Sequence, residues 1–130
     1  MPHFHVDYSA NLEERLSIAD LLVAIRDAAM ETGIFPLAGI RVRATACDHW
    51  VIADGNPDHA FLDISVRLRA GRPDEAKKRA TRDIFSAVET FCAEAMAYSS
   101  LMLSLEMRDI DPGLSPKASS IRNYLPGASQ

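Results

Sequence analysis

Two kinds of hydrophobic pattern take turns along the chain, and this order constrains the fold more than any other feature. Apolar and polar residues alternate over residues 2–8, 39–47, 60–69 and 101–107, as in strands that bury one face. Within each pair of strands, a stretch of helically spaced apolar residues separates the two members. The two helical stripes are Ile18, Leu21, Leu22, Ile25 and Ala29, and Ala80, Ile84, Ala87, Val88, Phe91 and Ala95. The sequence thus predicts strand-helix-strand twice within about 108 residues.

This order predicts an α/β (α+β) fold in which two consecutive β-α-β units share a four-stranded sheet, with both helices on one face. We expect one domain over residues 1–130, with its core at about 2–108. The tail, 109–130, is rich in Pro, Gly and Ser and should be irregular, with a short helix around 116–124. We expect the other sheet face to carry Ile, Val and Leu between polar groups. Because a chain of this size cannot cover both faces, association through that face is predicted.

Local signals predict where the elements begin and end. Asn11 and Glu14 have the spacing of a capping box, which predicts a helix start there. Residues 50–52 are apolar and should extend or resume the second strand. The run Asp54-Gly55-Asn56-Pro57-Asp58 is a strong turn signal. Gly71-Arg72-Pro73 should close the third strand and open the second helix.

Composition narrows the class of partner. The chain is 48% apolar and 25% charged, with a net charge of −4, so nothing in its composition favours nucleic-acid binding, which needs a basic face. No apolar run approaches the ~20 residues that cross a bilayer, and no signal peptide is apparent. Cys47 and Cys92 lie far apart, which argues against a disulfide framework. We therefore expect a cytoplasmic protein with neither a nucleic-acid nor a membrane partner.

The start of the chain carries the first candidate site. Pro2 follows Met1, and methionine aminopeptidases remove Met1 when the next side chain is small. The mature chain would then begin with a secondary amine, which can accept a proton, at the head of a strand. The bland alternative is that a proline after Met1 has no function. His3, His5 and Asp7 share the opposite strand face and raise a metal site as an alternative; polar positions in an oligomer interface are the preferred interpretation.

Four stretches have the order and spacing of one enzyme family: Pro2-His3-Phe4, residues 32–43 (Thr-Gly-Ile-Phe-Pro-Leu-Ala-Gly-Ile-Arg-Val-Arg), Ala53-Asp54-Gly55 and Ala70-Gly71-Arg72. In these stretches the chain resembles the 5-carboxymethyl-2-hydroxymuconate Δ-isomerases of the tautomerase superfamily. The resemblance covers most of residues 2–108, except 44–50, and does not include the tail. The block around Gly33 to Arg43 is its most specific part.

The resemblance implies a homotrimer whose three sheets line a central barrel. It implies that Pro2 is the catalytic base and that Arg41 and Arg72 bind substrate. The implied reaction is a cofactor-independent isomerisation in the breakdown of 4-hydroxyphenylacetate (homoprotocatechuate), a bacterial cytoplasmic pathway. In it, 5-carboxymethyl-2-hydroxymuconate becomes 5-carboxymethyl-2-oxo-hex-3-ene-1,6-dioate. The partner is thus a small polycarboxylate, and neither a metal nor an organic cofactor is implied.

These residue types suit that chemistry. A base that both accepts and returns a proton should have a pKa near the working pH, and burial and nearby cations lower the pKa of an amine. Arginine stays charged and binds carboxylates through two parallel hydrogen bonds. Arg41 and Arg43 share a strand face, and the alternative for them is two solvated arginines; the alternative for Arg72 is a surface salt bridge. The ligand role is preferred for Arg41 and Arg72, and the solvated position for Arg43.

Two other functions stay open at this point. One is a tautomerase that acts on another unsaturated 2-hydroxy or 2-keto acid, which would need fewer cationic contacts than a tricarboxylate. The other is a non-catalytic module that binds a small ligand, because two β-α-β units also form small regulatory domains. Such a module would not need a free Pro2 amine, so blocking that amine separates it from an enzyme.

Overall fold

The computed structural model describes residues 2–127, and its elements follow the predicted order. The strands are β1 (His3–Ser9), β2 (Arg41–Cys47), β3 (Ala60–Arg69) and β4 (Leu101–Ile110). The α-helices are α1 (Ile18–Glu31), α2 (Asp74–Phe91) and α3 (Ala93–Tyr98). Short 3₁₀ segments are η1 (Ala10–Glu14), η2 (Leu37–Gly39), η3 (Pro112–Leu114) and η4 (Ile121–Tyr124).

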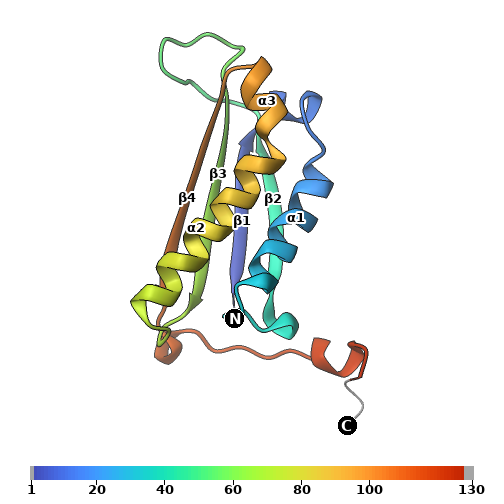
Figure 1. Cartoon of the computed structure of the whole chain (residues 1–130), viewed down its shortest axis with the longest axis vertical. Coiled ribbons are helices and arrows are strands. Elements are labelled where there is room, and N and C mark those ends of the chain that lie inside the picture. Colours follow the sequence, from blue (N-terminus) through green and yellow to red (C-terminus); the bar gives the residue numbers. More distant parts are fainter. Residues whose placement is uncertain (1, 128–130) are drawn as a thin grey trace.

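The strands form one mixed sheet in the order β2-β1-β3-β4. Strands β1 and β2 are parallel, as are β3 and β4, while β1 and β3 pair in antiparallel fashion at the centre. Helices α1 and α2 lie side by side across one face of this sheet (Figure 1). The prediction of two β-α-β units in one four-stranded sheet, with both helices on one face, is therefore confirmed.

The core lies between the sheet and the two helices. Every second residue of β3, from Ala60 to Leu68, is buried on the helix side, and alternate residues of β1 are buried beside them. Leu21 and Ile25 of α1 and Ile84 of α2 close the core from above, each with no exposed surface. This burial is the chief stabilising term in the fold, since burying a large aliphatic side chain contributes about 1.5–3 kcal/mol.

The open face of the sheet differs from the prediction. Its residues on the two central strands are polar or charged apart from Phe61, and they include His3, Asp7, Asp63 and Arg67. On β1 and β3, every apolar residue except Phe61 points to the helix side, because a strand that alternates strictly can bury only one of its faces. The predicted stripe of Ile, Val and Leu on the open face is thus wrong.

The predicted capping box at Asn11 and Glu14 is also wrong. Residues Ala10–Glu14 form a 3₁₀ turn, and α1 begins only at Ile18, where the Ser17 hydroxyl accepts a hydrogen bond from the Asp20 amide. The Asn11 side chain instead donates to the carbonyl oxygens of Pro57 and His59, at 3.2 and 3.0 Å. A contact across 46 to 48 residues thus replaced the local cap.

Residues 50–52 do not extend β2, contrary to the prediction. The indole N–H of Trp50 donates to the His59 carbonyl at 3.2 Å, which holds this stretch against the start of β3 as a loop. The predicted turn that follows is confirmed, with Asp54 and Asn56 side chains each accepting from an amide two residues on.

The second helical stripe is divided between two helices. Cys92 has ψ near 6°, instead of the value near −42° of an α-helix, so α2 ends at Phe91 and α3 carries Ala95. No glycine or proline marks this break in the sequence.

The two cysteines are both free. Cys92 is buried, and burial raises the pKa of its thiol to about 11. None of the helices in residues 2–127 combines the length and the apolar character that a membrane span needs.

The topology brings one end of all four strands to the same edge of the molecule. Strands β1 and β2 begin, and β3 and β4 end, at the same edge of the molecule, while the loop between β2 and β3 lies at the opposite edge (Figure 1). After β4, which runs three residues further than predicted, to Ile110, the tail crosses below the start of β1 (Figure 1). It contains η3 and η4, the second of which falls within the predicted short helix around 116–124.

Candidate active site

A cavity of about 810 Å³ opens where these strand ends meet. Its walls come from the start of β1, the connection between α1 and β2, the turn from β3 to α2, and the tail. The lining residues are Pro2, Phe35, Pro36, Ala38, Gly39, Leu68, Arg69, Ala70, Gly71, Arg72, Pro73, Lys117, Ala118, Ser119, Arg122 and Asn123. The volume suits a small organic ligand.

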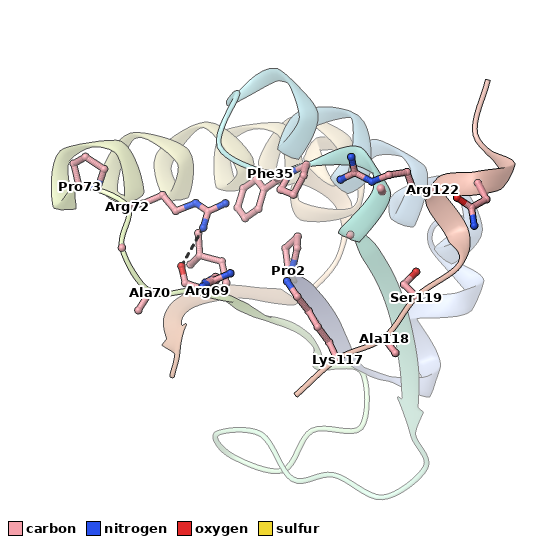
Figure 2. A pocket seen from close by; sticks show the side chains of 16 residues that line it. Pro2, Phe35, Arg69, Ala70, Arg72, Pro73, Lys117, Ala118, Ser119 and Arg122 are labelled. Carbon is pink, nitrogen blue, oxygen red and sulfur yellow. Dashed lines mark hydrogen bonds between the residues drawn. The ribbon is translucent and has the colours of Figure 1, made fainter. Parts of the chain in front are cut away.

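The cavity is cationic. Four of its lining residues are Arg69, Arg72, Lys117 and Arg122, and none of the lining residues within 2–127 is acidic. In Figure 2 the side chain of Lys117 runs from the tail toward Pro2, and Arg122 turns back toward the cavity from η4. In a protein with a net charge of −4, this concentration of positive charge favours an anionic ligand.

Pro2 lies at the centre of the cavity wall. It is buried and directly precedes β1, whose pairing with β2 and β3 holds the chain start in place. Phe35, which also lines the cavity, packs edge-on against Phe4 with ring centroids 5.1 Å apart. An apolar wall therefore stands beside Pro2, and Arg69, Arg72, Lys117 and Arg122 lie around it (Figure 2).

Arg72 is held in position by backbone oxygens. Its Nε and Nη2 donate to the Ile34 carbonyl at 3.3 and 3.0 Å, and its Nη1 donates to the Arg69 carbonyl at 3.2 Å. The preceding residue, Gly71, has a φ of +122°, a backbone conformation that residues other than glycine rarely adopt. Since a guanidinium has five N–H donors, two remain for a ligand. Arg72 thus joins the two β-α-β units and faces the cavity.

The structure separates Arg41 from the other two predicted site residues. Arg41 lines a neighbouring cavity of about 440 Å³, together with His3, Arg67 and the tail. Lys117 and Ala118 line both cavities, so a strip of the tail stands between Arg41 and Pro2. Arg43, the less favoured strand arginine, lies on the open face with Nη1 3.4 Å from Nδ1 of His3.

His3 reports the positive potential beside Pro2. It lies next to Arg41 and Arg67 across the sheet. Partial burial and the charges of Arg41, Arg67 and Arg43 lower the pKa of His3 from 6.5 to about 4. His3 is consequently neutral at pH 7.

The alternative metal site at His3, His5 and Asp7 finds no support in the described residues. Nε2 of His5 lies 3.0 Å from the Thr45 hydroxyl and 3.5 Å from an Asp7 carboxylate oxygen. His3 instead contacts Arg43 through its Nδ1 atom. Within residues 2–127, no group of three or more His, Cys, Asp or Glu side chains is arranged to hold a metal ion.

The sequence interpretation missed three of the four cavity cations. Arg69 is the last residue of a predicted strand. Alternation predicts on which face of the sheet its side chain lies, but not what that side chain contacts. Lys117 and Arg122 lie in the tail, which no periodicity places in space. The one available signal was compositional, because Lys117 and Arg122 are the two cations of residues 111–130.

Comparison with known proteins assigns the chain to a family. The family model of 5-carboxymethyl-2-hydroxymuconate isomerase matches residues 2–125. The chain belongs to the 5-carboxymethyl-2-hydroxymuconate isomerase family. The match extends past residue 108, so the tail segment that lines the cavity is part of the family pattern.

Individual isomerases agree with this assignment. The chain is 36% identical over 121 residues to the 5-carboxymethyl-2-hydroxymuconate Δ-isomerase of Escherichia coli, covering 93% of this chain and 96% of that one. It matches the crystal structure of an isomerase from Deinococcus radiodurans R1 with a TM-score of 0.87 and 31% identity, over 95% and 94% of the two chains. A second Δ-isomerase structure superposes with a TM-score of 0.89 over 95% and 92%, at 24% identity. The predicted tautomerase fold and family resemblance are thus confirmed.

Proposed function

We propose that this protein isomerises 5-carboxymethyl-2-hydroxymuconate to 5-carboxymethyl-2-oxo-hex-3-ene-1,6-dioate in homoprotocatechuate breakdown, and that the amine of Pro2 carries the proton. The observation that carries the proposal is a buried Pro2 directly before β1, which lines a cavity with four cations and no acidic lining residue among those described. Family membership supports the choice of substrate.

The proposed step moves one proton and needs no cofactor. The Pro2 amine accepts the proton of the C2 hydroxyl, the two conjugated double bonds shift to one double bond and a ketone, and the ammonium returns the proton to C5. Charge that builds on the dienolate faces the guanidinium of Arg72, whose hydrogen bonds to Ile34 and Arg69 fix it before substrate arrives.

The surroundings of Pro2 favour an amine that is neutral at working pH. Burial and nearby cations both disfavour an ammonium ion, and the lowered pKa of His3 next to Pro2 reflects these same two causes. A base that is free near neutral pH can both accept and donate the proton. The proposal requires that Met1 is removed, because an amide nitrogen is not basic.

The proposal also includes a cytoplasmic homotrimer and a role for Arg41 as a substrate ligand. The open face of the sheet carries polar and charged residues in ordered rows, and one such row contains Arg41, His3, Arg67 and Arg108. Three such faces turned inward would surround a polar channel. The role of Arg41 as a substrate ligand is supported by its position, because the cavity that it lines adjoins the cavity of Pro2 at Lys117 and Ala118.

The test combines intact mass with ultraviolet-monitored turnover of 5-carboxymethyl-2-hydroxymuconate. We expect wild type to lack Met1, and Pro2→Ala to lose roughly 100-fold or more in kcat, the usual contribution of a general base. Pro57→Ala, in the distant loop between β2 and β3, is the matched control and should keep the wild-type rate.

Four results would each overturn part of the proposal. Retention of Met1 in active protein, or a Pro2→Ala variant with full activity, would exclude the amine as the base. Binding of the substrate without turnover by processed wild type would instead favour a ligand-binding module. Faster turnover of a dicarboxylate than of the tricarboxylate would point to another substrate within the superfamily.

A further inference from the structure

The four cations of the cavity come from two separate parts of the chain. Arg69 and Arg72 belong to the turn from β3 to α2, inside the double β-α-β framework. Lys117 and Arg122 belong to the tail, which begins after β4 has ended at Ile110. The tail is thus an addition to the framework that doubles the number of positive charges in the cavity wall.

The two pairs differ in how they are held. Arg72 uses three donors on backbone oxygens and is fixed to the framework. Within residues 2–127, the side chains of Lys117 and Arg122 make no hydrogen bond or ion pair with another residue. Their charges are therefore uncompensated by protein groups at the cavity wall, as expected of groups that meet an anionic ligand.

Lys117 is the tail cation that lies between two adjoining cavities. It lines the cavity of Pro2 and also the neighbouring cavity of His3, Arg41 and Arg67. Figure 2 shows its side chain directed toward Pro2 from the side opposite Arg72. A ligand that touches Pro2 and Arg72 would have Lys117 within reach at its other end.

We infer that Lys117, assisted by Arg122, binds the carboxylate that distinguishes a tricarboxylate substrate from a dicarboxylate one, so that the tail determines substrate specificity. This inference rests on the proposed function. The framework pair, Arg69 and Arg72, serves carboxylates that both kinds of substrate carry. The tail pair serves the carboxymethyl arm.

The kinetic test compares two substrates on matched variants. The substrates are 5-carboxymethyl-2-hydroxymuconate and 2-hydroxymuconate, which lacks the carboxymethyl arm. For Lys117→Met we expect kcat/KM on the tricarboxylate to fall roughly 10- to 100-fold, the effect of losing one charged hydrogen bond, mainly through KM. On the dicarboxylate we expect a change of less than about threefold.

Two control variants isolate the effect of position from that of charge. Lys117→Arg keeps the charge and should retain most of the preference for the tricarboxylate. Lys78→Met removes one charge from the exposed surface of α2, outside this cavity, and should leave both substrates unaffected. An equal fall on both substrates for Lys117→Met, or no change on either, would overturn the inference.

A binding measurement separates failure of this inference from failure of the proposed function. Calorimetric titration with propane-1,2,3-tricarboxylate and with glutarate involves no proton transfer by Pro2. If the tail reads the third carboxylate, Lys117→Met weakens binding of the tricarboxylate and leaves glutarate unchanged, even in a protein that turns nothing over. If wild type is an active isomerase and Lys117→Met binds both probes as wild type does, the inference fails while the proposed function stands.

Discussion

Among single residues, His3 shows how strongly the arginines act on the start of the chain. Partial burial of its ring, followed by the charges of Arg41, Arg67 and Arg43, lowers the pKa of His3 to about 4. Because the folded pKa lies below the unfolded value of 6.5, the unfolded chain binds more protons between these pH values. His3 therefore reduces stability as the pH falls from 6.5 toward 4.

We predict that Arg67→Gln raises the pKa of His3 toward 6.5, since one of the charges that oppose its protonation is removed. The measurement is an NMR titration of the His3 ring protons. Arg79→Gln, which removes an exposed charge from α2, should leave this titration unchanged. A pKa of His3 near 6.5 in the wild-type protein would contradict the description of a strongly positive chain start.

Among the elements, the loop between β2 and β3 carries a chain of hydrogen bonds. Nε2 of His59 lies 2.7 Å from an Asp54 carboxylate oxygen, and Nδ1 lies 2.6 Å from the Ser100 hydroxyl. The Asn56 amide also donates to Asp54, at 3.1 Å. These contacts hold the loop to the starts of β3 and β4, and Trp50 donates to the His59 carbonyl beside them.

The hydrogen bond from the Asn56 amide, followed by that from His59, lowers the pKa of Asp54 below 3.8. The resulting stabilisation is complete above pH 3.8 and is lost as the pH falls through the folded pKa. We predict that fluorescence of Trp50, the one tryptophan of the chain, changes in this acid range in wild type and not in Asp54→Asn. Asp58→Asn, in the same loop, should behave as wild type, and an identical acid response in all three proteins would contradict the assignment.

In the whole molecule, the open face of the sheet is the main surface without a covering layer (Figure 1). Its charged rows do not resemble the apolar face first expected, so burial of apolar area is not what would drive association there. A charged face of this kind favours enclosure around a polar channel over close contact between two sheets.

We predict that wild type sediments at three times the 14.3 kDa mass of one chain. On the open face, the Asp63 carboxylate accepts a hydrogen bond from the Ser104 hydroxyl at 2.6 Å. Asp63→Arg reverses the charge at this position and should shift the protein toward the monomer. Asp83→Arg makes the same change on the exposed side of α2 and should remain trimeric. Wild type that is monomeric at micromolar concentration would exclude the proposed assembly.

Much of the framework was predictable because it depends on local patterns. Alternation gave the four strands, and the helical stripes gave α1 and most of α2, since burial of one face follows directly from the spacing of apolar residues. The errors came where a distant contact overrode a local signal. Asn11 was expected to cap a helix and instead holds the loop at Pro57 and His59.

The candidate site was predictable only in part. Pro2 was a candidate because it follows Met1, the family resemblance implied its role and that of Arg72, and the fold places both in one cavity. Lys117 and Arg122 carry no local signal, because a cation in an irregular tail looks the same whether it faces solvent or a cavity. Their meeting with Pro2, more than 110 positions away in sequence, follows from the path of the tail after β4.

The order of the residues was thus enough to predict the four strands and most of the two long helices, because each of these depends on side chains a few positions apart. Their pairing into two units followed from the general rule for strand-helix-strand order. The location of the cationic cavity required the packed molecule. It arises where β1 and β2 begin and β3 and β4 end, and only the packing of the sheet, the helices and the tail brings those segments within contact distance.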